Sequence, residues 1–310
     1  MTNLKCQMSN DKSNILVSIV CITYNHEPYL RQALEGFLMQ ETDFPVEIIL
    51  AEDCSTDGTR AICEEYAEKY PGKIKYIYRD HNVGYNENEY EAMCTATGKY
   101  IAYCEGDDYW TDSLKLKKQV DFLESHPDYS VCWHRCMHRN VKTGVDMDDN
   151  CGQILPKDVE GMDIDMDTYF SGWYTQPLTM VFRKEALDLS LYHSYKYFRD
   201  MHQMYHLLKN GKGYLFAFEG GVRNVHEGGI ASMISHKKYC DVAIPMLKEF
   251  YDNTKNKWTK KLYMTSLEEG VQEYAQDKKY VALRYVLQYL WLTGRWGSLW
   301  RNIKVICKNN

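Results

Sequence analysis

The sequence predicts an α/β fold in which a mostly parallel β-sheet is flanked by helices and followed by a helical C-terminal extension. Three observations lead to this prediction. Apolar runs alternate with helical patterns over the first 110 residues, which requires crossover connections between parallel strands. These runs are nearly continuous, as in strands that are covered on both faces. Beyond His236 the pattern is helical throughout.

The elements of the first half follow from the period of their apolar residues. The predicted strands cover residues 17–22, 46–51, 73–78 and 98–104, and the helices between them cover residues 28–38, 59–70 and 85–96. Pro28 suits the opening of the first helix, and Pro71-Gly72 ends the second. The ligand-binding edge of such a sheet is the one at the carboxyl ends of its strands.

The second half is less regular. We expect strands at 129–137, 179–182 and 214–218, and helices at 112–125, 184–191 and 199–209. Residues 141–167 are acidic and lack periodicity, which indicates a long loop. Loops of this length in compact domains are usually functional or disordered.

The charge divides the chain into two parts. The net charge is −6, but residues 1–236 carry 23 Lys and Arg against 36 Asp and Glu, whereas residues 237–310 carry 14 against 7. The acidic part is not expected to bind nucleic acid, and the basic part suits an anionic surface. We expect an N-terminal tail at 1–14, one α/β domain at 15–235 and a helical extension at 236–310.

Nothing in the sequence predicts export. Residues 1–14 lack the apolar core of a secretory signal, and no run approaches the ~18 apolar residues of a spanning helix. The 11 cysteines are irregularly spaced, so they do not suggest a disulfide framework. We therefore expect a cytoplasmic protein whose cysteines are mostly buried and reduced.

An acidic cluster, Glu105-Gly106-Asp107-Asp108, follows the strand at 98–104. Three carboxylates this close repel one another unless a cation or a shared proton offsets their charge. A hard divalent cation that also holds phosphate oxygens is a natural partner. A solvated acidic turn and a structural calcium loop are the alternatives.

Polar residues also follow the first two strands. Thr23-Tyr24-Asn25 offers an aromatic ring and hydrogen-bonding groups for a base, and Asp53 could accept from a base N–H or a ribose hydroxyl. Asp57 precedes Gly58-Thr59, and we interpret it as a turn and cap residue.

Four ordered segments resemble the nucleotide-sugar motifs of family 2 glycosyltransferases with the GT-A fold: residues 17–25, 52–59, 82–84 and 105–108. The resemblance covers roughly residues 15–235. It implies transfer of a sugar from a nucleoside diphosphate donor, with inversion at the anomeric carbon and with Mg²⁺ or Mn²⁺ as cofactor.

The resemblance also implies roles for individual residues. Asp107 and His226 would hold the metal, although a lone histidine can equally be structural. Asp200 would be the catalytic base, and its alternative role is to interact with the dipole of the helix that it begins. Apart from the resemblance, we expect Asp108, Trp110 and Trp173 to contact the acceptor, the two tryptophans by their aromatic surface. The expected donor-binding residues are Thr23, Tyr24, Asn25, Glu27, Asp53, Asn82, Gly84, Asn88, Glu105, Gly106 and Arg223.

The chain departs from the family pattern at two places. Glu105 stands where the family often has Asp, so its longer side chain would face the ribose or a metal-bound water. Many members carry an Arg-Asn pair in the helix after Gly84, whereas this chain has Asn88-Glu89-Tyr90. The donor contacts that the Arg-Asn pair makes in the family are therefore expected to come from Asn88 here.

A zinc site is suggested by Cys132, His134, Cys136 and His138, which would share one face of a strand. Same-face neighbours lie about 6.6 Å apart, whereas zinc bonds are about 2 Å long. One straight strand could therefore supply at most two ligands, and we do not expect structural zinc.

The end of the chain combines aromatic, aliphatic and basic residues over positions 291–308. This pattern suits a helix in a membrane interface, and a terminal helix packed on the catalytic domain is the alternative. Peripheral membrane contact would fit a lipid-linked saccharide acceptor.

We therefore expect a cytoplasmic glycosyltransferase that moves a sugar from a UDP-sugar to a glycan or lipid-linked saccharide in cell-surface polysaccharide synthesis. A nucleotidyltransferase is one alternative, but it would typically have a Gly-rich basic loop after the first strand, where this chain has Thr23-Tyr24-Asn25-His26-Glu27. A non-catalytic nucleotide- or glycan-binding protein is the other.

Overall fold

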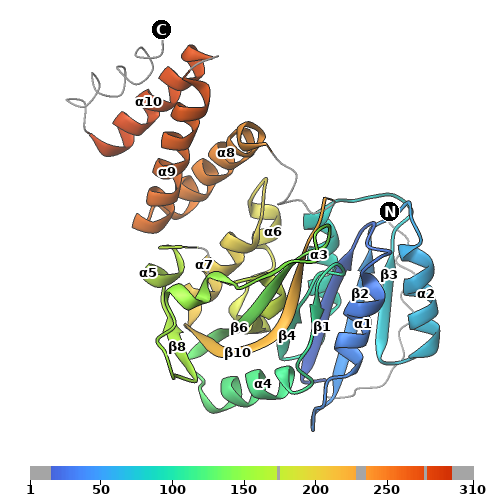
Figure 1. Cartoon of the computed structure of the whole chain (residues 1–310). Coiled ribbons are helices and arrows are strands. Elements are labelled where there is room, and N and C mark those ends of the chain that lie inside the picture. The colour runs from blue at the N-terminus through green and yellow to red at the C-terminus, as the bar shows by residue number, and fades with distance from the viewer. Residues whose placement is uncertain (1–14, 173–174, 228–234, 276–277, 295–310) are drawn as a thin grey trace. The chain divides into compact units, whose positions relative to one another are not determined.

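The structure is a computed structural model, and it describes residues 15–172, 175–227, 235–275 and 278–294. The chain forms two compact units (Figure 1). The first contains the residues up to Ser194 together with Phe198–Val225, and the second contains Tyr195–Tyr197 and the residues from His226 onward.

The first half of the first unit is a parallel sheet in the order β3-β2-β1-β4. Every residue of the central strand β1 is buried, which is why its sequence is almost continuously apolar. The strands are β1 (Val17–Thr23), β2 (Val46–Glu52), β3 (Ile74–Tyr78) and β4 (Tyr100–Tyr103).

Three helices connect these strands: α1 (Leu30–Leu38), α2 (Thr59–Lys69) and α3 (Tyr85–Thr95). Figure 1 shows α1 and α2 in front of the parallel strands and α3 behind them. This arrangement follows from right-handed crossovers, because the chain moves outward from β1 to β3 and then returns across the sheet to β4.

The second half of the sheet contains antiparallel pairs. Strand β9 (Val181–Arg183) lies antiparallel between β4 and β6, and β6 (Tyr129–Asn140) then pairs in parallel with β10 (Lys212–Val225). Strand β10 also pairs antiparallel with β5 (Tyr109–Trp110) and β8 (Gly161–Ile164), and β7 (Asp146–Met147) pairs with β6. The sheet is mostly parallel and flanked by helices, which confirms the predicted fold class.

The remaining elements of the first unit are short, apart from two helices. These elements are α4 (Lys115–Ser125), α5 (Met166–Tyr169), α6 (Leu191–Ser194) and α7 (Asp200–Asn210), with 3-10 turns at Asn150–Gln153, Pro177–Thr179 and Lys184–Ala186.

Two predictions for this half were wrong. Residues 141–167 are not one loop, because β7, a 3-10 turn, β8 and the start of α5 form there. The helix predicted at 184–191 is only a 3-10 turn followed by α6, because the side chain of Asp188 accepts a hydrogen bond from the N–H of Ser190 and starts a new turn.

The second unit contains α8 (His236–Thr254), α9 (Lys257–Tyr274) and α10 (Lys279–Thr293). Asn256 caps α9 by accepting from the N–H groups of Trp258 and Thr259. At Gly270 a Cβ would lie 2.6 Å from a side-chain carbon of Ile244 and 2.8 Å from one of Tyr285. Glycine therefore lets α9 pack closely between α8 and α10. Among the residues described, no helix is both long and apolar enough to cross a bilayer.

Candidate active site

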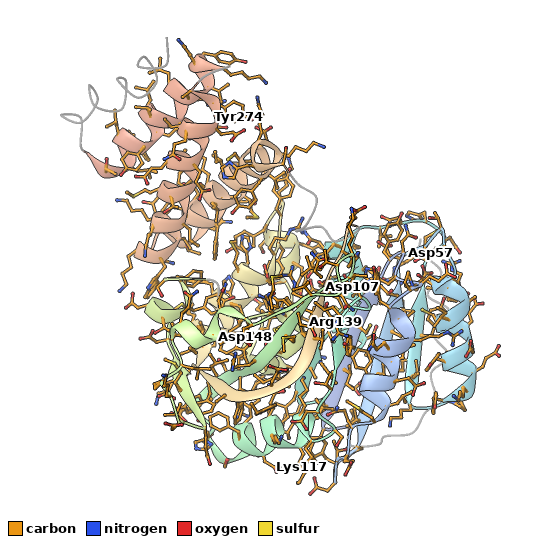
Figure 2. The ribbon with its side chains drawn as sticks, viewed as in Figure 1. Asp57, Asp107, Lys117, Arg139, Asp148 and Tyr274 are labelled. Carbon is orange, nitrogen blue, oxygen red and sulfur yellow. The ribbon has the colours of Figure 1, made fainter. Side chains whose placement is uncertain are left out.

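The candidate site lies at the carboxyl ends of the parallel strands. Strand β1 pairs with β2 on one side and with β4 on the other, so the segments that follow these three strands emerge side by side. Figure 2 shows Asp57, which follows β2, and Asp107, which follows β4, along this edge, whereas Lys117 lies at the opposite edge. This is the edge at which open α/β sheets bind ligands.

The segments after β1 and β2 are joined by hydrogen bonds. Asn25, which has a positive φ of 56°, donates its N–H to Ser55 Oγ (3.0 Å), and its Oδ1 accepts from the N–H of Thr56 (2.8 Å). Glu27 Oε2 accepts from the N–H of Gly58 (2.8 Å), and the N–H of Glu27 donates to Asp57 Oδ2 (3.2 Å). Asn25 and Glu27, both predicted donor-binding residues, thus fix the conformation of this edge.

Asp57 has the role that the sequence analysis favoured. Its Oδ1 accepts from the N–H of Thr59 (3.0 Å) at the start of α2, and these hydrogen bonds to Thr59 and Glu27 keep the pKa of its carboxyl below the ordinary value despite some burial. Asp57 is therefore a turn residue before α2, as predicted, whereas the N-cap position itself is occupied by Gly58.

Asp53 joins the end of β2 to the turn before α3. Its two carboxylate oxygens accept from the N–H groups of Val83 (2.7 Å) and Gly84 (2.9 Å), and its carbonyl accepts from Asn82 Nδ2 (3.0 Å). Burial nevertheless raises the pKa of Asp53. Gly84 has a φ of 86°, a conformation that favours glycine. Asp53, Asn82 and Gly84 therefore form one hydrogen-bonded unit, and their role in donor binding stays a prediction.

Asn88 is buried, and both ends of its amide are engaged. Its Nδ2 donates to the carbonyl of Ala51 (3.0 Å), and its Oδ1 accepts from Arg79 (3.2 Å). The hydrogen bond to Ala51 connects α3 to the end of β2. The predicted contact of Asn88 with the donor would have to be made without breaking these two bonds.

Gly106 lies against β1. Its N–H donates to the carbonyl of Ile22 (3.0 Å), and a Cβ at this position would lie 2.7 Å from Thr23 Oγ1. Thr23 Oγ1 is buried and makes no hydrogen bond to the described part of the chain. The acidic segment, residues 105–108, thus passes directly over the end of β1. It lies beside the Thr23 hydroxyl, which has no hydrogen-bond partner in the described part of the chain.

Asp107 points toward a residue that the sequence analysis did not select. Its Oδ2 lies 3.7 Å from His26 Nε2, and its carbonyl accepts from Asn224 Nδ2 (2.6 Å). His26 is held in place because its N–H donates to Thr59 Oγ1 (2.8 Å). The available signal was the position of His26, three residues after the end of β1 and within the segment Thr23-Tyr24-Asn25-His26-Glu27.

Several charges surround Glu105. Burial raises the pKa of its carboxyl to about 8, with further increases from Asp107, Glu89 and Asp200, and Arg223 opposes them. Asp200 begins α7, and burial raises its pKa to about 6 although Arg199 and Arg223 lower it. The structure therefore brings Glu105, Asp107, Asp200 and Arg223 into one electrostatic cluster.

Glu89 is a second residue that the sequence analysis missed as a site residue. It is buried, and burial and the neighbouring Asp200 raise its pKa to about 7, while the nearby Tyr192, Tyr85 and Arg199 side chains lower it. The Tyr85 hydroxyl lies 3.2 Å from that of Tyr103, which in turn donates to Glu105 Oε1 (3.5 Å). A chain of polar groups therefore connects Glu89 to the acidic segment. The departure from the family pattern at this position was the signal.

Two predicted acceptor-binding residues are corrected. The Trp110 side chain belongs to the core: the residue is 2% exposed, its Nε1 donates to the carbonyl of Leu178 (2.8 Å), and its ring packs against Phe37 and lies 3.7 Å from Lys115 Nζ. Asp108 is also buried, and its Oδ1 accepts from the N–H of Asn224 (2.8 Å). Neither side chain offers a surface to an acceptor.

The other predicted site residues lie in three different parts of the chain. Tyr24 is exposed at the ligand-binding edge. Trp173 lies outside the described residues. His226 belongs to the second compact unit, so its predicted role as a metal ligand stays a prediction. Within the described residues no three His, Cys, Asp or Glu side chains have the spacing of a complete metal site.

A parallel half-sheet with an acidic segment after β4, continued by antiparallel strands, is the arrangement of the GT-A fold. The model of glycosyl transferase family 2 matches residues 18–187. The chain therefore belongs to glycosyl transferase family 2.

Curated relatives match part of the chain. An uncharacterized protein of Mycobacterium bovis is 52% identical over 118 residues, which are 38% of this chain and 34% of that protein. TuaG of Bacillus subtilis, named provisionally as a teichuronic acid biosynthesis glycosyltransferase, is 36% identical over 108 residues, 35% of this chain and 42% of that protein. The chain thus matches less than half of the length of each of these relatives.

Solved structures share the fold. Residues 1–349 of TarS from S. aureus, in complex with UDP-GlcNAc, match with a TM-score of 0.64 at 18% identity, over 90% of this chain and 81% of that one. A mannosyltransferase from Pyrobaculum calidifontis, in complex with GDP-Man and Mn²⁺, matches with a TM-score of 0.51 at 14% identity, over 97% and 90%. At these identities the likeness establishes the fold alone.

Proposed function

We propose that this glycosyltransferase moves a sugar from a UDP-sugar to a saccharide or lipid-linked saccharide acceptor, with inversion, in the synthesis of a cell-surface polysaccharide. One observation carries the proposal: Asp107 and Asp200 share one electrostatic cluster with Glu105 and Arg223 at the ligand-binding edge. The choice of UDP is supported by the UDP-GlcNAc complex of the structural neighbour TarS, and the choice of acceptor by the name of TuaG.

The donor would lie across the ends of β1 and β2. Tyr24 is exposed there and could stack on the base, while Thr23 Oγ1 has a free hydrogen-bonding capacity near Gly106. Asp53 holds the turn at Asn82 and Gly84 by three hydrogen bonds, which fixes the wall of the nucleotide site. Arg223 lies in the same cluster of charges and would pair with a phosphate.

Asp200 would act as the base. Its pKa of about 6 leaves it largely ionised at neutral pH while keeping it a better proton acceptor than an ordinary aspartate. In the proposed step the acceptor hydroxyl gives its proton to Asp200 as its oxygen attacks the anomeric carbon. The bond from that carbon to the diphosphate oxygen breaks on the opposite face, and UDP leaves with the bonding electrons.

Asp107 would hold a Mg²⁺ or Mn²⁺ ion, and His226 remains a proposed further ligand. The residues fit this cofactor because Glu105 and Asp108 both have raised pKa values, caused by burial and by the neighbouring carboxylates. A cation would relieve that repulsion. When bound, it would neutralise charge on the departing diphosphate.

A donor panel tests the proposal. The protein is incubated with UDP-, GDP- and TDP-sugars and Mn²⁺, with and without saccharide acceptors, and nucleoside diphosphate release is followed. A parallel reaction contains UTP, a sugar phosphate and Mn²⁺, and pyrophosphate release is followed. Release of UDP from one UDP-sugar supports the proposal. Release of pyrophosphate from UTP and a sugar phosphate would instead indicate a nucleotidyltransferase, and nucleotide binding without release from any donor would indicate a binding protein.

A further inference from the structure

Helix α10 has two apolar faces. Ala282, Val286 and Leu290 are buried within the second unit, where α10 packs against α9. On another face lie Tyr280, Leu283, Leu287 and Trp291, which are 74%, 42%, 45% and 74% exposed. Their spacing of three, four and four residues places them on one stripe of the helix.

The four exposed side chains of this stripe form one contiguous apolar patch rather than isolated exposed residues. Its four side chains line one open hollow on the helix surface together with Arg284 and Gln288. Contiguous apolar patches of this kind usually mark an interaction site, whereas scattered exposed apolar residues need no explanation. Arg284 and Gln288 lie beside the stripe, so this surface of the helix is amphipathic.

The charge around the stripe selects the partner. Lys278, Lys279 and Arg284 are exposed, and from Lys278 to Asn310 the sequence has seven Lys and Arg residues but no Asp or Glu. Two copies of such a surface would repel each other, which disfavours a symmetric pairing of α10 with itself. An anionic lipid surface is attracted instead, because basic residues near a membrane bind acidic headgroups while Trp and Tyr favour the interface.

We propose that α10 lies in the interface of an anionic bilayer, with Tyr280, Leu283, Leu287 and Trp291 inserted among the lipids and with Arg284 and the neighbouring lysines at the headgroups. This inference does not depend on the sugar that the protein transfers or on the role of any residue at the candidate active site. It would place a glycosyltransferase at the surface that carries lipid-linked saccharides.

Vesicle flotation of the full-length protein tests the proposal. Vesicles of pure phosphatidylcholine are compared with vesicles that also contain phosphatidylglycerol, at low and high salt. The stripe variant is Leu287→Gln/Trp291→Gln. Its matched control is Tyr239→Gln/Val242→Gln, which changes two exposed apolar residues on α8 that are 47% and 43% exposed. A second variant, Trp296→Gln/Trp300→Gln, changes the end of the chain without changing the stripe.

The wild-type protein and the α8 control are expected to float with the anionic vesicles and to lose binding as salt rises, whereas the stripe variant should bind at least tenfold more weakly. Circular dichroism and UDP release in solution should be the same for all variants that fold. Equal flotation of the stripe variant and the wild type would overturn the proposal, as would absence of binding by the wild type. Loss of flotation only in the Trp296/Trp300 variant would assign membrane binding to another segment and overturn the proposal. Size-exclusion chromatography tests for a dimer: a dimer that is lost only in the stripe variant would identify a second copy of the chain as the partner instead.

Discussion

Gly106 packs against Thr23 so closely that a Cβ on the glycine would lie 2.7 Å from Thr23 Oγ1 and 2.9 Å from Thr23 Cβ. The main chain of the acidic segment and the end of β1 therefore touch without an intervening side chain. Thr23 is also buried, so it has little freedom to move away.

The first prediction follows from this contact. Gly106→Ala should displace the acidic segment, lower UDP release at least tenfold and destabilise the fold by about 1–3 kcal/mol, the usual cost of inserting a methyl group into a packed site. Gly152→Ala is the control, because no atom lies within 4 Å of a Cβ there. Urea unfolding and UDP-release assays measure both effects. An alanine variant with normal activity would show that the contact does not constrain the site.

The second prediction concerns Asp200. Asp200→Asn should leave UDP affinity nearly unchanged and lower the rate of transfer by about 10² or more, the usual contribution of a general base. Isothermal calorimetry gives the affinity and a single-turnover assay gives the rate. Glu185→Gln, on an exposed turn of the same unit, should have no effect. Wild-type turnover by Asp200→Asn would remove this residue from the mechanism.

The third prediction is the pH dependence of the wild-type rate. The base must be ionised, so the rate should fall as pH drops through about 6, the pKa of Asp200. Because the folded pKa is above the ordinary value of 3.8, ionised Asp200 destabilises the fold, and this cost appears as pH rises from about 4 to 6. Asp200→Asn should therefore be the more stable protein at pH 8 and lose that advantage at pH 4. Urea midpoints at the two pH values provide the measurement.

The fourth prediction concerns Glu89. The pKa of its carboxyl is about 7 in the folded protein and 4.5 ordinarily, so the fold favours the protonated form. The stability of the folded protein therefore decreases as pH rises from about 4.5 to 7 and Glu89 ionises. Glu89→Gln keeps the size of the side chain but cannot ionise. It should therefore stabilise the protein at pH 8 by up to about 3 kcal/mol relative to its effect at pH 5, given roughly 1.4 kcal/mol per pKa unit. An unchanged difference between pH 5 and pH 8 would show that Glu89 does not titrate in this range.

The fifth prediction concerns the metal. Asp107→Ala should abolish the part of UDP affinity that requires Mn²⁺, while affinity in EDTA should be the same as for the wild type. Asp80→Ala, an exposed carboxylate after β3, is the control. If calorimetry with Mn²⁺ gives the same UDP affinity for the wild type and Asp107→Ala, then Asp107 is not a ligand.

The elements with a clear period were the ones that the sequence predicted well. The four parallel strands and their helices follow from continuous apolar runs and amphipathic patterns, which depend on local sequence alone. Strand β5 and the antiparallel position of β9 were not predicted, because two- and three-residue strands have no measurable period and their partners lie far away in the sequence. Strand β10 is longer than its apolar part because register shifts let it continue past Phe218.

The candidate site was predicted in outline for a similar reason. Motifs at strand ends identify residues that share an edge, as Thr23, Asp53 and Asp107 do. They do not show which way a side chain points, so Trp110 and Asp108 were assigned to an acceptor although both are buried. His26 and Glu89 were missed because their importance arises from contacts with residues distant in the sequence.

The hydrogen bonds between the segments after β1 and β2 run in both directions, from Asn25 to Ser55 and from Gly58 to Glu27. Neither segment can therefore change conformation without breaking bonds to the other. A nucleotide that immobilises Tyr24 should also slow amide hydrogen exchange at Thr56 and Gly58, although it need not touch them.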